Sequence, residues 1–204
     1  MSGIYLHIPF CKKACHYCDF HFSTSQDLMN DMVQSIAREI TLRKNYLAGE
    51  KVETIYFGGG TPSLLSEDQL NLLLETIKEN FEVDAEAEIT LESNPDDLSI
   101  ELLQMLRSAG VNRLSIGIQS FRETDLLLMN RAHNAVQALQ CVSDAKSAGF
   151  ENITIDLMYG LPELSPEDWT ENMKIAFGLG VDHLSCYSVT VGAKNCIGFN
   201  DQAK

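Results

Sequence analysis

The sequence predicts an α/β protein folded as a six-stranded partial (β/α)6 barrel. Strand-like and helix-like segments alternate along the whole chain, which is typical of a parallel sheet with right-handed crossovers. Six segments have strand character, and distinctive polar groups lie at the carboxyl end of nearly every one of them. In a barrel all these strand ends meet at one mouth, whereas in an open doubly wound sheet only those near the switch point meet.

The elements follow from local patterns. The strands are expected where Ile, Val, Leu and Tyr concentrate, at residues 4–8, 52–57, 87–92, 113–119, 152–158 and 183–191. Apolar residues at helical spacing predict amphipathic helices between the strands, with one face formed by Met32, Val33, Ile36 and Ile40 and another by Leu70, Leu73, Leu74, Ile77 and Phe81. Helix starts are indicated by the capping box of residues 66–69 and by Ser165-Pro166, and left-handed helix ends by Gly49, Gly110, Gly149 and Gly180.

Composition limits the class of function. The chain has 204 residues, of which 45% are hydrophobic, enough for one core and too few for two ordinary domains. Fifteen Lys and Arg against 29 Asp and Glu give a net charge of −14, which disfavours a nucleic-acid binder. Short apolar runs predict no membrane span, and the first ten residues lack a signal-peptide pattern. We therefore expect a cytoplasmic protein with reduced cysteines.

Three cysteines lie within eight residues directly after the first strand, in Cys11-Lys-Lys-Ala-Cys15-His-Tyr-Cys18. Three unrelated buried thiols would be one explanation, and a structural zinc site another, with a fourth ligand from His7, His16 or His21. No further cysteine is near in sequence, since Cys141 is expected on a helix and Cys196 in the tail. Three thiolates on a four-iron cluster would leave one iron open, which makes a metal centre reactive.

The remaining polar strand ends are ambiguous when each is taken alone. Gly58-Gly-Gly-Thr-Pro62 fits a tight turn as well as a close approach to a ligand, and Glu92 fits a solvated strand-end acid. For Arg131 a surface salt bridge is the better explanation from the residue alone. Asp156 lies inside an apolar strand, where a buried acid needs hydrogen-bonding partners.

The Cys-x3-Cys-x2-Cys motif, with Tyr17 just before the third cysteine, resembles the signature of radical S-adenosylmethionine (SAM) proteins. The resemblance implies the partial barrel of the radical SAM type and a 4Fe-4S cluster on Cys11, Cys15 and Cys18. It also implies that SAM chelates the open iron and that an electron from the cluster yields a 5′-deoxyadenosyl radical.

Further motifs run in order across residues 4–162: IYLHIPFCxxxCxYCDF, YFGGGTPSLL, ESNP, RLSIGIQSF, LMNRAH and IDLMYGLP. Together they resemble the oxygen-independent coproporphyrinogen III oxidase group, and most of all its heme-chaperone branch. This resemblance implies that Tyr5 lies beside the cluster and Tyr17 near the adenine. The expected residues around SAM are Gly59, Gly60, Thr61, Glu92, Gln119, Arg131 and Asp156. Its implied partners are a heme or porphyrin ligand, with heme as candidate cargo, an electron donor protein and a heme-accepting protein.

Two departures separate the branches. The oxidases carry an additional cysteine two residues after the third, where this chain has Phe20, and a long N-terminal extension. Both favour a heme chaperone over the alternative, a radical decarboxylase of coproporphyrinogen III. A third reading, an RNA-modifying radical SAM enzyme, is disfavoured by the acidic charge. We expect a radical SAM core at residues 1–191 and an atypical tail at 192–204, in place of the family's C-terminal domain.

Overall fold

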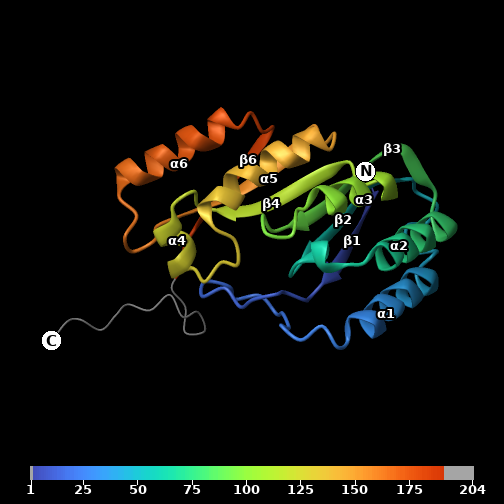
Figure 1. Cartoon of the computed structure of the whole chain (residues 1–204). Helices are drawn as coiled ribbons and strands as arrows, with labels where there is room; N and C mark the ends of the chain where they lie inside the picture. Colours follow the sequence, from blue (N-terminus) through green and yellow to red (C-terminus); the bar gives the residue numbers. More distant parts are fainter. Residues whose placement is uncertain (1, 191–204) are drawn as a thin grey trace.

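The computed structural model describes residues 2–190, which form one parallel sheet of six strands in sequence order (Figure 1). This confirms the predicted number, direction and order of the strands. The strands are β1 (Ser2–Ile8), β2 (Val52–Gly59), β3 (Val83–Ser93), β4 (Arg113–Gln119), β5 (Asn152–Tyr159) and β6 (His183–Ser188).

The strand order explains the curvature of the sheet. Right-handed crossovers between strands in sequential order place the connecting helices on one face, and the sheet curls with its other face inward. Neighbouring helices pack in the same sequence, α1 on α2, α2 on α3 and α3 on α5. Strands β1 and β6 each pair with one neighbour only, so the barrel is open between them. The helices are α1 (Met29–Leu42), α2 (Glu67–Asn80), α3 (Ile100–Ala109), α4 (Glu123–Leu128), α5 (Ala135–Ser147) and α6 (Pro166–Gly178), with a 3-10 turn at Pro62–Leu64.

The two faces of the sheet differ in polarity because strand side chains alternate. Apolar side chains such as Ile55, Leu114 and Ile155 are fully buried in the hydrophobic core. The alternate positions carry polar groups, among them Tyr56 on β2 and Asp156 on β5. Burial of the apolar set drives folding and leaves the polar set for the concave face.

The helix starts agree with the predicted caps. Ser66 and Gln69 form a reciprocal capping box at α2, and Ser165 caps α6 with Pro166 in its first turn. A third box, formed by Asn134 and Gln137 at α5, was not predicted. These side chains satisfy backbone N–H groups that lack partners in the first helical turn.

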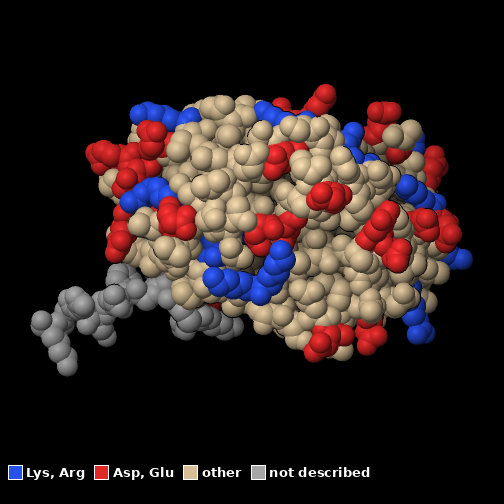
Figure 2. All heavy atoms as spheres, in the orientation of Figure 1, with Lys and Arg blue, Asp and Glu red and all other residues tan. Residues whose placement is uncertain are grey.

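Some boundaries differ from the sequence-based expectation. Strand β3 begins at Val83 rather than at residue 87, and α1 ends at Leu42, so that Gly49 (φ 84°) belongs to a separate turn. Strand β6 ends at Ser188 rather than at residue 191, and the expected tail at 192–204 lies outside the described residues. Within residues 2–190, no helix is long and apolar enough to cross a bilayer. Acidic side chains are spread over much of the face shown in Figure 2.

Candidate functional site

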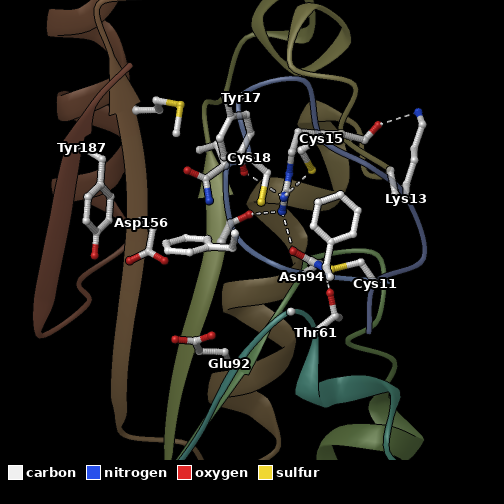
Figure 3. A pocket seen from close by; sticks show the side chains of 18 of the residues that line it. Cys11, Lys13, Cys15, Tyr17, Cys18, Thr61, Glu92, Asn94, Asp156 and Tyr187 are labelled. Atoms are coloured by element: carbon white, nitrogen blue, oxygen red, sulfur yellow. Dashed lines mark hydrogen bonds between the residues drawn. The ribbon is translucent and has the colours of Figure 1, made fainter. Parts of the chain in front are cut away.

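A cavity of about 440 Å³ opens where the strand ends meet the cysteine loop (Figure 3). This volume lies in the range of small-molecule sites. All the predicted site residues except Tyr5 line it: Cys11, Cys15, Tyr17, Cys18, Gly59, Gly60, Thr61, Glu92, Gln119, Arg131 and Asp156. The convergence of strand ends predicted from the sequence is therefore present. Figure 3 shows Glu92 and Asp156 on one side of the cavity and the three cysteines on the other.

The cysteine loop is fixed by the segment that precedes α5. His16 donates its backbone N–H to the Met129 carbonyl at 3.0 Å, and its Nδ1 lies 2.9 Å from the Leu128 carbonyl. The Asn130 amide donates to the Ala14 carbonyl at 2.7 Å, from a backbone with φ 57°. The LMNR segment thus positions the loop that carries the thiols.

A second anchor joins the loop to the turn after β3. Lys12, between the first two cysteines, forms ion pairs with Asp96 and Asp97. The Asp97 side chain is only 2% exposed and also accepts a hydrogen bond from Ser63 at 2.8 Å. Because one partner is buried, this contact holds the loop more firmly than an exposed pair would.

The glycines after β2 have a packing role of their own. Gly60 donates its N–H to the Ile8 carbonyl at 2.9 Å. A Cβ at Gly60 would lie 2.7 Å from the Phe10 carbonyl oxygen and 2.8 Å from its nitrogen. At Gly59 (φ 112°) a Cβ would meet the His7 ring at 2.6 Å. The close approach of two backbones therefore requires glycine at position 60, and the left-handed φ favours it at position 59, whatever ligand the cavity takes.

Glu92 is held inside the cavity rather than solvated as a simple strand-end acid. Its carboxylate accepts a hydrogen bond from the Tyr56 hydroxyl at 2.8 Å and one from the Gly59 N–H at 2.9 Å. Burial and the charge of Glu92 raise the pKa of Tyr56, which keeps its hydroxyl protonated as a donor.

Asp156 faces the same space from β5. Burial, followed by repulsion from Glu92, raises its pKa from 3.8 to about 6, although a hydrogen bond from Ser185 works in the opposite direction. Two carboxylates that share one cavity and lose solvation there create a site that favours a cation.

Arg131 is mostly buried, so the explanation as a surface salt bridge is wrong. One of its terminal nitrogens, Nη1, lies 3.3 Å from Cys15 Sγ and 3.1 Å from the Tyr17 hydroxyl. The other, Nη2, donates to Asn94 Oδ1 at 2.5 Å and to the Gly117 carbonyl at 2.6 Å. Asn94 was not singled out from the sequence, although it lies in the ESNP motif that supplied Glu92.

Gln119 ends β4 in a strained conformation. Its φ of 68° is unusual for a residue with a side chain, and the register of β4 against β5 shifts just before it. The side chain is 8% exposed and lines the cavity, and its Oε1 finds no hydrogen-bond partner within residues 2–190. A buried acceptor of this kind is free to accept a hydrogen bond from a group inside the cavity.

Tyr5 lies outside the cavity. Its ring stacks on Tyr56 with centroids 5.8 Å apart, and its hydroxyl is 3.1 Å from His7 Nδ1. The side chain is 58% exposed. Tyr5 is therefore linked to the cavity through Tyr56, whose hydroxyl bonds Glu92.

The donor groups of the cavity determine which kind of metal centre it can hold. Within the part of the chain that the structure describes, no three His, Cys, Asp or Glu side chains converge on a point for a single ion. A four-iron cluster does not need such convergence, because each thiolate binds a different iron. The three thiols line one cavity beside an unpartnered acceptor and two carboxylates, which fits a cluster with a polar, cationic co-ligand.

The sequence is similar to those of two groups of characterised proteins. The heme chaperone HemW of Bacillus subtilis is 38% identical over 197 residues, 95% of this chain and 52% of that protein. HemW of Lactococcus lactis is 41% identical over 92% of this chain and 49% of its own length. Oxygen-independent coproporphyrinogen III oxidase of Escherichia coli is 34% identical over 91% of this chain and 41% of its own length. The chain spans about half the length of the HemW proteins it matches.

Solved structures similar to this chain include a protein of the same two groups. Coproporphyrinogen III oxidase (HemN) from E. coli, described as a radical SAM enzyme, superposes with a TM-score of 0.84 over 92% of this chain and 44% of that one. An archaeal Elp3 from Methanocaldococcus infernus, 19% identical, shares the fold with a TM-score of 0.67. The model of the radical SAM superfamily matches residues 5–176. That match covers most of the barrel and the cysteine loop, and the chain belongs to the radical SAM superfamily.

Proposed function

We propose that this chain is the cluster- and SAM-binding core of a heme chaperone, with a 4Fe-4S cluster on Cys11, Cys15 and Cys18. The observation that carries the proposal is the cavity in which these three thiols meet Glu92 and Asp156. Membership of the radical SAM superfamily implies the cluster and SAM. The HemW proteins, at 38% and 41% identity, support the heme-chaperone branch.

Different residues of the cavity would bind different parts of SAM. Glu92 and Asp156 attract its cationic groups, and Gln119 Oε1 accepts a hydrogen bond from it. The backbone at Gly59 and Gly60, with Thr61, lines the same cavity beside Glu92, and Tyr17 would lie near the adenine. Bound there, SAM and the reduced cluster would supply radical chemistry, in which one electron from the cluster cleaves the sulfonium bond.

The alternative function is that of an oxygen-independent coproporphyrinogen III oxidase, supported by the 34% identity and the TM-score of 0.84 to HemN. Phe20 weighs against it, because it stands where the oxidases carry an additional cysteine. Its side chain is 76% exposed at the rim of the cavity, where it supplies no metal ligand.

The proposed partners follow from the same branch. They are a heme or porphyrin ligand, a protein that donates electrons to the cluster, and a protein that accepts heme, all in the cytoplasm. His7 and His21 are exposed imidazoles beside the cysteine loop and are candidate heme ligands, whereas His16 is engaged with the Leu128 carbonyl.

The test begins with anaerobic reconstitution of the full chain with iron and sulfide. Replacing Cys11, Cys15 and Cys18 together with Ala should abolish bound iron and the near-ultraviolet-to-visible charge-transfer absorption. Cys141→Ala and Cys186→Ala serve as matched controls, because Cys141 is buried on α5 and Cys186 is exposed on β6. Stoichiometric zinc in place of reconstitutable iron would contradict the cluster.

The branch is tested on the loaded chain with SAM and a reductant. We expect no consumption of coproporphyrinogen III above a control without protein. Titration with heme, followed by the Soret band, should show a shift that is lost when His7 and His21 are replaced. Turnover of coproporphyrinogen would overturn the chaperone assignment and favour the oxidase.

A further inference from the structure

The three cysteine sulfurs receive hydrogen bonds from donors of different charge. Cys11 is bonded by the Thr61 side chain, and Cys18 by the backbone of Phe20, both of which are neutral. Cys15 lies 3.3 Å from Nη1 of Arg131, a group that stays charged at all accessible pH values. Among these donors the guanidinium alone brings a full positive charge to a sulfur.

The structure also explains why this guanidinium stays in place. Nη2 is fixed by Asn94 Oδ1, from the turn after β3, and by the Gly117 carbonyl of β4. Nη1 is shared between Cys15 and the Tyr17 hydroxyl. These acceptors other than Cys15 are neutral, so they orient the guanidinium without cancelling its charge. Both terminal nitrogens are occupied by the protein before any ligand is present.

We propose that Arg131 is a positioning residue that raises the reduction potential of the cluster through its charged hydrogen bond to the Cys15 thiolate. The proposal rests on the proposed cluster site. On reduction the cluster takes one electron from an external reductant and becomes more negative. A fixed positive charge beside a ligand sulfur stabilises that reduced form more than the oxidised form.

This role differs from the one implied by the family resemblance, in which Arg131 is one of the residues around SAM. A residue that acts only on SAM would leave the potential of the SAM-free cluster unchanged. A residue that acts on the cluster changes that potential before SAM is added. The SAM-free chain therefore separates the two roles.

The experiment is a redox titration of the reconstituted full chain without SAM, with dithionite as reductant and the electron paramagnetic resonance signal of the reduced cluster as readout. Arg131→Gln should lower the equilibrium constant for one-electron reduction about 10- to 100-fold, as expected for a full charge a few ångströms away. At about 59 mV per tenfold, this is a negative shift of about 60–120 mV. Arg131→Lys should recover part of the shift, because it restores the charge without the planar fork.

Two further variants complete the design. Arg113→Gln is the matched control, because Arg113 bonds Thr90 and Thr154 at the opposite end of β4 and its loss should leave the potential unchanged. Tyr17→Phe removes a neutral partner of Arg131 and also the hydrogen bond between the Tyr17 hydroxyl and Cys15. It should shift the potential in the same direction by less, because the full charge of Arg131 remains. It also provides a measurement if Arg131→Gln loads poorly.

Each outcome of these measurements supports or overturns the role of Arg131. Loaded Arg131→Gln with the wild-type potential overturns the proposal, and a shift of equal size in Arg113→Gln does so too, because it would show a general charge effect. If Arg131→Gln loads poorly, an unshifted Tyr17→Phe overturns the proposal. If Arg131→Gln has normal iron and sulfide content and an unshifted potential, the role of Arg131 is refuted and the proposed function stands. If the wild type binds no cluster, both the proposed function and this inference are refuted.

Discussion

Asp156→Asn should stabilise the fold of the cluster-free chain, although Asp156 is predicted to bind SAM. Burial and the charge of Glu92 hold the native pKa of Asp156 near 6, against 3.8 for the ordinary side chain. At 1.36 kcal/mol per pKa unit, ionising Asp156 costs the native state about 3 kcal/mol at pH 7. Asparagine keeps an acceptor for Ser185 and removes the charge.

The sign of the pH dependence follows from proton binding. The native state binds the Asp156 proton more tightly than the unfolded state, so stability falls as the pH rises from 3.8 to about 6. Above pH 6 the whole penalty is present. The gain from Asp156→Asn should therefore be up to about 3 kcal/mol at pH 7 and about half of that at pH 5.

Urea denaturation followed by circular dichroism, at pH 7 and pH 5 under reducing conditions, measures both values. Glu75→Gln, which neutralises an exposed acid on α2, is the control and should change stability by less than about 0.5 kcal/mol. An Asp156→Asn chain no more stable than the wild type at pH 7, or a gain independent of pH, would refute the reasoning about buried like charges.

Three further predictions concern the walls of the cavity. Glu92→Gln should weaken SAM binding to the cluster-loaded chain about 10- to 150-fold in calorimetry, because a charge-assisted hydrogen bond is lost. Its iron content should stay unchanged, and an affinity equal to that of the wild type would contradict the role of Glu92 in binding SAM. Gly60→Ala should lower the free energy of unfolding in urea by about 1–3 kcal/mol, since its Cβ would meet the Phe10 backbone at 2.7 Å. The control Gly178→Ala, whose Cβ would have no atom within 4 Å, should not destabilise the chain, and equal effects would contradict the packing argument. Asn130→Ala should be about 1–2 kcal/mol less stable than Asn130→Gly, because alanine is strained at φ 57° and glycine is not. Identical melting curves would count against this reasoning.

The amino-acid pattern by itself determined the architecture. Alternating apolar segments set six strands and their helices, and sequential right-handed crossovers then leave few arrangements other than a curling parallel sheet. The caps at Ser66 and Ser165 were also predictable, because they depend on side chains and backbone within one turn. The cysteine spacing and the strand-end motifs identified the class of site for the same reason: each lies in a short segment.

The tertiary structure decided which groups meet inside that site. The bond from Arg131 to Cys15 joins residues 116 positions apart, and the same guanidinium reaches Asn94 on a third segment. No local pattern encodes that meeting, so the residue alone favoured a surface salt bridge. The raised pKa of Asp156 likewise depends on Glu92, two strands away in the sheet and 64 residues earlier in the sequence. The charge, burial and hydrogen bonding of one side chain depend on groups from segments far apart in the sequence. Only the folded sheet, with its strand register, fixes the distances between those groups.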